Sequence, residues 1–141
     1  KACKQIGWRL CTEDELLRAC GGRSGSAYTF GSVFENGACN IRGIYIPCEG
    51  CMPTEAPTGH FENCVSQEGA YDLTGNLWEW SSRTDAGDPD VRYYHSAGYK
   101  LTAEFHRDTD MVCNKANRLP GSLAAAYAAD TVGFRCCRDA N

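Results

Sequence analysis

The sequence has no long apolar run, no basic stripe and no N-glycosylation sequon. Its longest apolar cluster, Leu123 to Ala129, is mostly alanine and is far shorter than the roughly 18–20 apolar residues that cross a membrane. The net charge is −4 and the pI is near 5.3, and Lys and Arg are scattered, which disfavours a nucleic-acid partner. Because no Asn-x-Ser/Thr triplet occurs, no N-glycan is expected.

Cysteine, in contrast, is abundant: there are 10 among 141 residues. Such a count indicates either disulfides in an oxidising compartment or metal–thiolate sites. A zinc site of four thiolates usually shows two Cys-x2-Cys pairs, and only Cys48–Cys51 has that spacing. Adjacent Cys136 and Cys137 suit two diverging bridges better than a chelate. We therefore predict a disulfide-bonded domain that is secreted or displayed at the cell surface.

The clearest local prediction is a short helix over residues 12–20. Thr12 is a candidate N-cap, and Glu15 completes a capping box with it. The acidic residues 13–15 would lie at the positive end of the helix dipole, and Gly21-Gly22 would end the helix.

The remaining pattern predicts an α+β domain with little regular structure. Residues 21–69 are rich in Gly, Pro, Asn and Cys, and we expect long ordered loops there, with short strand pieces such as 44–46. Short strands are predicted at 77–81 and 132–136, and a surface loop at 83–95.

The segment from Gly69 to Trp80 carries the most chemical information. Alternation would put Trp78 and Trp80 on one face of a strand and Glu79 on the other. On one interpretation the tryptophans are core residues and Glu79 is solvated. On the other, Asp72 and Glu79, joined by a turn with exposed carbonyls, bind a hard cation such as calcium. The residues alone leave both open.

Three ordered motifs resemble the formylglycine-generating enzyme (sulfatase-modifying factor) family. Residues 69–80 resemble its G-x-Y-D/N-x-x-G-N-x-W-E-W signature, residues 7–22 its G-K-R-L-P-T-E-A-E segment, and residues 133–136 its closing G-F-R-C. The resemblance implies a C-type-lectin-like fold with long loops and two helices.

The resemblance also implies two calcium sites. The first would use the side chains of Asp72 and Glu79 and the carbonyls of Gly75 and Leu77. The second, in a loop altered by inserted cysteines, would be formed by Asn40, the Ile41 carbonyl, and an acid and a carbonyl near Glu49 and Cys51.

Catalysis in this family depends on copper held by two thiolates, in a run of three cysteines whose last member is structural. Here Cys113 takes the structural place, and the two positions before it in the run are Asp108 and Ala103. No cysteine lies between Cys64 and Cys113, and Asp and Ala cannot replace thiolates for copper(I). We therefore expect no formylglycine generation and no copper. The three histidines show no ligand spacing and are interpreted as ordinary surface or core residues: His60, His95 and His106.

By position in the family, Cys3–Cys136 and Cys20–Cys113 correspond to structural bridges. Three further pairs are hypotheses. Cys11 takes a family proline position beside the helix, where it would lie close to the adjacent cysteine of the last strand, which suggests Cys11–Cys137. Cys39–Cys64 would hold the ends of the irregular region, and Cys48–Cys51 would close a small local loop.

The resemblance further implies that residues 1–141 form the C-terminal portion of one family domain. Its first strand and most of its first helix would lie upstream, and residues 2–7 resemble the end of that helix. No signal peptide is visible at Lys1, so we expect that the chain was processed or that its beginning is missing.

The leading functional hypothesis is a non-catalytic extracellular binding or assembly module that contacts protein, or less readily glycan. Its expected binding face comprises Tyr93, Tyr94, Tyr99, His106 and Asp108. One alternative is an enzyme that reuses the groove through residues such as Asp108, Asp110 or His106. Another is a hypervariable ligand-binding protein, although the stretch 123–126 lacks the Asn and Tyr typical of that class.

Overall fold

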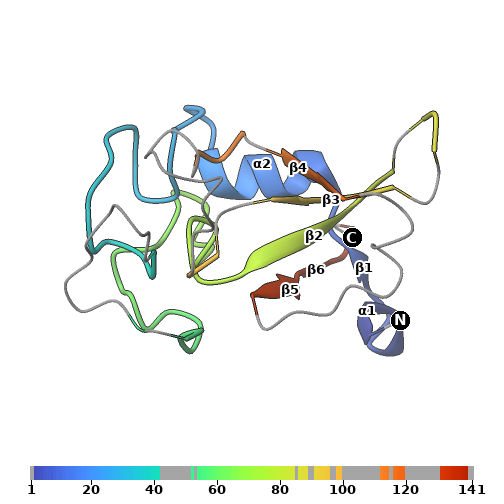
Figure 1. Cartoon of the computed structure of the whole chain (residues 1–141), viewed down its shortest axis with the longest axis horizontal. Helices are drawn as coiled ribbons and strands as arrows, with labels where there is room; N and C mark the ends of the chain where they lie inside the picture. The colour runs from blue at the N-terminus through green and yellow to red at the C-terminus, as the bar shows by residue number, and fades with distance from the viewer. Residues whose placement is uncertain are drawn as a thin grey trace.

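A computed structural model describes residues 2–41, 52, 54–84, 86–88, 91–95, 98–99, 112–114, 116–119 and 131–139. A small mixed sheet and two helices occupy one side of the molecule, and the irregular segments among the described residues 22–41 and 54–77 occupy the other (Figure 1). The elements are α1 (Ala2–Gln5), β1 (Arg9–Leu10), α2 (Glu13–Gly21), β2 (Trp78–Thr84), β3 (Arg92–His95), β4 (Ala116–Leu119), β5 (Val132–Phe134) and β6 (Cys136–Cys137). Both helices are far too short to cross a membrane, and no helix of the described part could do so.

Helix α2 confirms the predicted helix and its capping box. The Glu15 N–H donates to Thr12 Oγ1 at 3.2 Å, and the Thr12 N–H donates to Glu15 Oε2 at 2.8 Å. Arg9 adds two contacts of 2.7 Å to the same carboxylate, and together with the Thr12 N–H it lowers the pKa of Glu15 to about 2. Leu16 and Cys20 turn the apolar side of the helix into the core.

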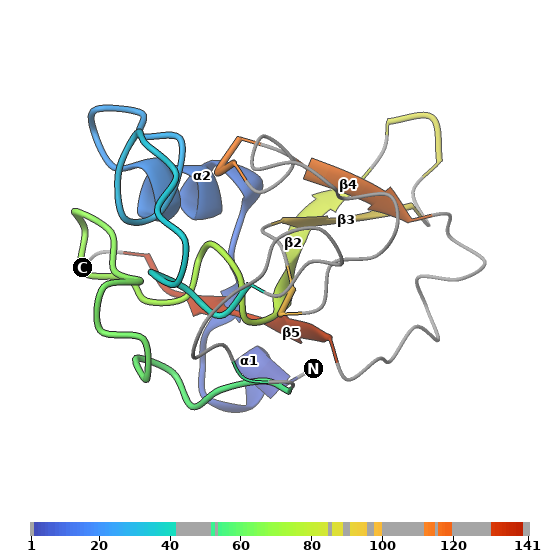
Figure 2. The same cartoon turned by 60° about the vertical axis from the view of Figure 1, so that its left-hand side comes forward.

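Four strands form a sheet in the order β4-β3-β2-β5, and β1 pairs with β6 in a separate ribbon. Strand β2 is antiparallel to β3 and parallel to β5, so that Trp80 lies between Tyr94 and Phe134. Turning the molecule shows α2 on the side of the sheet near β4, with α1 below β5 (Figure 2).

The strand predictions are correct in place and wrong in extent. Strand β2 reaches Thr84 and β3 occupies 92–95, so the predicted surface loop 83–95 is shorter at both ends. Its acidic centre suggested a loop, but Arg92-Tyr-Tyr-His has aromatic residues that favour strands and pack on the tryptophans of β2. The predicted strand 132–136 is divided at Arg135 into β5 and β6.

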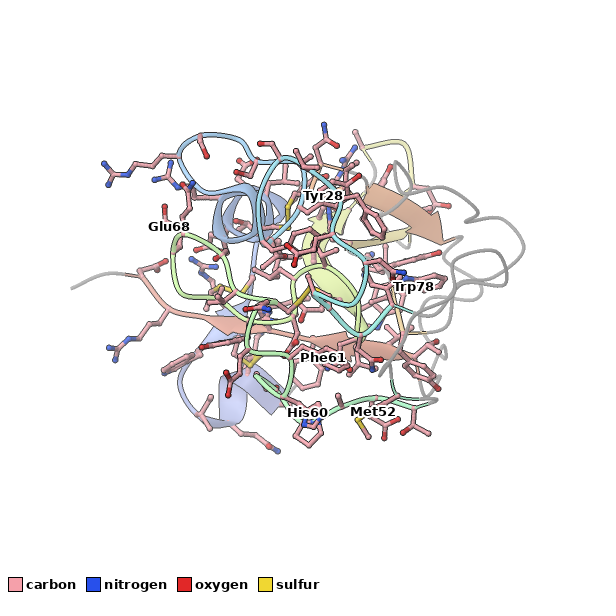
Figure 3. The ribbon with its side chains drawn as sticks, turned by 90° about the vertical axis from the view of Figure 1, so that its left-hand side faces the viewer. Tyr28, Met52, His60, Phe61, Glu68 and Trp78 are labelled. Atoms are coloured by element: carbon pink, nitrogen blue, oxygen red, sulfur yellow. A yellow bond between two sulfur atoms is a disulfide. The ribbon has the colours of Figure 1, made fainter. Side chains whose placement is uncertain are left out.

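The described part of residues 22–77 forms no named helix or strand, as expected for long ordered loops. Isolated bridges join Tyr28 to Gly31 and Val65 to Tyr71. Tyr28 and Trp78 lie in one buried cluster with the Cys39–Cys64 pair, and both side chains are drawn inside the molecule in Figure 3. The predicted strand piece 44–46 lies outside the described residues.

Four disulfides hold this fold, and every cysteine that the structure describes belongs to one of them. They coincide with four of the five pairings expected from the sequence, namely Cys3–Cys136, Cys11–Cys137, Cys20–Cys113 and Cys39–Cys64. The fifth expected pair, Cys48–Cys51, lies outside the described part of the chain. Three of the bridges connect the first 20 residues to residues 113–137 and so close the domain on itself.

Candidate functional site

The two carboxylates of the Gly69–Trp80 segment line one cavity of about 320 Å³. Asp72 and Glu79 are 4% and 7% exposed, so neither is the solvated acid of the simpler interpretation. Strand β2 carries Glu79, and the preceding turn carries Asp72. The other lining residues are Thr58, Asn76, Leu77, Gly133, Phe134 and Arg135.

The turn that joins the carboxylates has an unusual backbone. Asp72, Gly75 and Asn76 have φ values of 60°, 85° and 61°. Gly75 has no alternative residue, because a Cβ there would lie 2.8 Å from the Asn40 carbonyl oxygen and 2.6 Å from Ile41 Cγ1. The Asn76 N–H donates to the same Asn40 carbonyl at 2.9 Å. The turn is therefore pressed against residues 40–41, which fixes its position.

Arg135 is the residue at this site that sequence reasoning missed. Its Nε lies 2.9 Å and 2.7 Å from the two Glu79 oxygens, and one terminal nitrogen lies 2.7 Å from Oε1. The same guanidinium donates to the Tyr71 carbonyl at 2.6 Å. The G-F-R-C motif identified Arg135 as a family residue without giving it a role. Its place between β5 and the Cys136 bridge brings it over the strand that carries Glu79.

Burial governs the electrostatics of both acids. Desolvation raises the pKa of Glu79, and the Arg135 hydrogen bonds and charge oppose that rise. Desolvation likewise raises the pKa of Asp72, opposed by the Gly59 N–H, which donates to its Oδ2 at 2.9 Å. Two carboxylates face one guanidinium, so the ionised site keeps a surplus negative charge.

The donor types, two carboxylates and a backbone carbonyl, suit a hard cation, and both Glu79 oxygens already accept hydrogen bonds from Arg135. Calcium prefers carboxylate and carbonyl oxygens, and the surplus negative charge of Asp72 and Glu79 lies beside oxygens of these kinds. Of the four residues expected to form the first site, Asp72, Leu77 and Glu79 line the cavity, whereas Gly75 does not. Elsewhere in the described part, the one group of three candidate ligand residues is Cys11, Glu15 and Cys137, and its cysteines are joined to each other.

Asn40, which was expected at the second calcium site, forms hydrogen bonds to two residues of a neighbouring loop. It is fully buried, its Oδ1 accepts from the Met52 N–H at 3.0 Å, and its Nδ2 donates to the Thr54 carbonyl at 2.9 Å. Figure 3 shows Met52 on the outer loop that Asn40 thereby fastens. Ile41 is buried beside it, and Glu49 and Cys51 lie outside the described residues.

The tyrosines expected to form a binding face are mostly core residues. Tyr93 and Tyr99 are 9% and 4% exposed, and Tyr94 stacks on Trp78 with ring centroids 4.9 Å apart. The expectation of an exposed tyrosine face is therefore wrong for Tyr93, which lies on strand β3 where it pairs with β2, and for Tyr99, whose N–H donates to the Asn76 carbonyl at 2.6 Å. His106, Asp108 and Asp110 lie outside the described part.

The histidines agree with their interpretation as ordinary residues where they are described. His60 is exposed and lies against Phe61. His95 is 4% exposed, and its Nε2 lies 3.6 Å from a Glu13 oxygen that is also paired with Arg83. Burial lowers the pKa of His95.

No thiolate of the described residues is free to bind copper. Cys113, the last cysteine of the family's catalytic run, is bonded to Cys20. The two preceding positions, Ala103 and Asp108, carry no sulfur whatever their placement.

Comparisons with known proteins agree with these observations. The family described as "Sulfatase-modifying factor enzyme 1-like domain" matches residues 1–140. A Bos taurus protein named inactive C-alpha-formylglycine-generating enzyme 2 is 33% identical over 98% of this chain and 46% of its own length. Its Mus musculus counterpart is 31% identical over 98% and 45%. The chain thus spans about half the length of these relatives.

Two solved structures share the fold. CarF superposes with a TM-score of 0.66 at 19% identity, covering 95% of this chain and 48% of its own. PvdO from Pseudomonas aeruginosa gives 0.65 at 18% identity, covering 94% and 54%. By its sequence match over nearly the whole length, this chain belongs to the formylglycine-generating enzyme (sulfatase-modifying factor) family.

Proposed function

We propose that this protein is a non-catalytic, extracellular binding module built on a C-type-lectin-like scaffold, and that its ligand is another protein. The observation that carries the proposal is the lack of any cysteine from residue 65 to 112, combined with the bonding of Cys113 to Cys20. A copper(I) centre needs soft thiolates, and this chain offers none where the family's chemistry takes place.

Two further observations support a non-catalytic role. The bovine and murine relatives are both named as inactive forms of the enzyme. Four disulfides indicate an oxidising compartment, which supports the proposal of secretion or surface display. The disulfides stabilise long loops without much regular structure, and loops on a rigid scaffold are suited to recognition.

A turnover assay tests the non-catalytic part. The purified protein, supplied with copper and a thiol reductant, is incubated with a sulfatase peptide that contains the target cysteine, and mass spectrometry follows the cysteine. We expect the peptide to be recovered unchanged, while an active family member converts it under the same conditions. Conversion by this chain would refute the proposal.

We further propose that the cavity at Asp72 and Glu79 holds a structural calcium ion. Asp72, Glu79 and the carbonyl of Leu77 would hold the ion, which would supply the positive charge that balances the surplus carboxylate. Because the turn 72–76 and the Arg135 segment meet at this cavity, an ion there would brace the irregular side of the molecule against the sheet.

Thermal unfolding in calcium and in chelator tests the ion. Binding to the folded state alone stabilises by about 2.7 kcal/mol when the ion is at 100 times its Kd. We expect calcium to raise Tm for the wild type and for Glu62→Gln, an exposed control, but not for Asp72→Asn. Equal Tm values in millimolar calcium and in chelator would refute the proposed calcium ion. They would not affect the proposed binding function.

A further inference from the structure

A second cavity, the polar cavity, is formed by the C-terminal end of α2 and by two loops, residues 26–31 and 65–67. Figure 3 labels Tyr28, within the first loop, and Glu68, just after the second. The cavity measures about 220 Å³, less than the roughly 300–1,000 Å³ of pockets for drug-sized ligands, so it suits a ligand with a single ring. It shares no described lining residue with the candidate calcium cavity.

None of the described residues that line the polar cavity is charged. Glu68, which follows Gln67 in the sequence, is paired with Arg18 at 3.1 Å, and Arg23 is exposed and does not line the cavity. A ligand with a full charge would lose its hydration here without meeting an opposite charge, and that loss is costly. The lining therefore favours an uncharged, polar ligand.

Three polar side chains of the cavity have hydrogen-bonding capacity left for a ligand. The buried Ser66 hydroxyl accepts from a backbone N–H at 3.2 Å, and it donates to no group in the described part of the chain. Gln67 Oε1 accepts from Ser24 at 3.3 Å, whereas the Gln67 amide nitrogen donates to none of the described residues. Thr29 Oγ1 donates to Thr74 Oγ1 at 2.9 Å and therefore retains an accepting lone pair. The cavity thus offers donors and an acceptor together.

Phe30 supplies the aromatic ring among the described lining residues. It stacks on Tyr28 with ring centroids 5.3 Å apart and an angle of 2° between the ring planes, which fixes its position. Phe30 is half-buried, so part of its surface stays open to a ligand. The disulfides of Cys20 and Cys64 hold the segments on either side of the cavity. A ligand therefore meets a preformed site and does not have to order it, which favours affinity.

We propose that the polar cavity binds one neutral sugar residue, with sugar hydroxyls bonded to Thr29, Ser66 and Gln67 and a C–H face of the ring against Phe30. Each sugar hydroxyl both donates and accepts, the ring carries apolar C–H groups, and a neutral hexose has no charge, so its chemistry matches the lining. A free amino acid would bring two charges that the lining cannot pair. The inference goes beyond the proposed protein-binding function and does not depend on it.

Saturation-transfer NMR on the intact, disulfide-bonded protein tests the polar cavity. The probes are the methyl glycosides of glucose, galactose and mannose, with glucuronic acid, glucosamine and uridine at the same concentration. We expect at least one neutral glycoside to receive saturation from the protein, in chelator as in calcium, because the cavity is separate from the candidate calcium cavity. The two charged sugars and the nucleoside should receive none.

Two variants place the sugar in the cavity. Gln67→Leu removes the free amide donors from an exposed side chain, and Ser66→Ala removes the buried hydroxyl; each should weaken binding about fivefold, as for the loss of one neutral hydrogen bond. Gln5→Leu is the matched control, because Gln5 is exposed and does not line the cavity. Circular dichroism and Tm establish that each variant folds.

Several outcomes would overturn the assignment. No transfer to any neutral glycoside, or equal binding to Gln67→Leu, Ser66→Ala and wild type, would exclude a sugar in this cavity. Stronger binding of uridine or of a charged sugar would assign the cavity to another class of ligand. Sugar binding that requires calcium would place the sugar at Asp72 and Glu79 instead. None of these results would affect the proposed protein-binding function, which is tested separately.

Discussion

Removal of Arg135 isolates the strongest electrostatic contact at the candidate site. In Arg135→Leu, the Glu79 carboxylate keeps its 7% exposure but loses all three short contacts to the guanidinium. The Tyr71 carbonyl loses its donor as well. A buried charge left without its partner costs about 3–5 kcal/mol, which is a large part of the 5–15 kcal/mol that stabilises a typical domain.

The reverse deletion should cost much less. Glu79→Gln leaves an amide that still accepts a hydrogen bond, and Arg135, with 28% of its side chain exposed, can turn to water. We expect a loss of about 1–2 kcal/mol. The double variant should be more stable than Arg135→Leu alone, because it carries no buried unpaired charge.

Urea unfolding with the disulfides intact and with chelator present measures these differences, and pH provides a second check. Burial raises the pKa of Glu79 above its ordinary 4.5, so acid protonates the stranded carboxyl. The deficit of Arg135→Leu relative to wild type should therefore shrink between pH 7 and pH 5. A deficit below about 1 kcal/mol, or one that does not depend on pH, would show that Glu79 is not the buried anion described above.

Three further predictions concern stability. Burial lowers the pKa of His95 from 6.5, so on acidification the unfolded chain protonates this histidine at a higher pH than the folded protein does. The free energy of unfolding should therefore fall as the pH drops below about 6.5. Urea titrations at several pH values should show a flatter pH dependence for His95→Gln. Gly75→Ala should destabilise by about 2 kcal/mol or more through its positive φ and its clash with the Asn40 carbonyl, and an unchanged Tm would contradict the turn geometry. Replacing Cys3 and Cys136 by Ser should cost about 3 kcal/mol, because the Cys11–Cys137 bridge already closes the long loop and this bridge closes a ring of only roughly ten residues. A loss below about 1 kcal/mol would show that the unfolded chain is already restrained there.

The elements that could be predicted from sequence are those set by local chemistry or by the family motifs. The capping box at Thr12 and Glu15 is a contact between residues three apart, so a short pattern contains all of it. Of the four described disulfides, Cys3–Cys136 and Cys20–Cys113 followed from family position and Cys11–Cys137 from the adjacency of Cys136 and Cys137. Cys39–Cys64 was a hypothesis that this pair would hold the ends of the irregular region. The loss of the copper ligands is a property of residue identity and needs no structure.

The features that were missed depend on contacts between distant segments. Arg135 meets Glu79 across 56 residues, and nothing near either residue indicates the partner. Tyr93 and Tyr99 were expected on a binding face because aromatic residues in loops on a rigid scaffold suit recognition. Pairing of β3 with β2 buries Tyr93, and the Tyr99 N–H donates to the Asn76 carbonyl at 2.6 Å.

Copper(I) binding tests the central claim most directly, because the family's chemistry requires the metal before any substrate. The protein is titrated against a chromophoric copper(I) chelator, with an active family member as the positive control. This account predicts that the chelator keeps its copper at every protein concentration, as it does in the presence of a disulfide-bonded protein without free thiols. Stoichiometric transfer of copper(I) to this chain would contradict the proposal that it is non-catalytic.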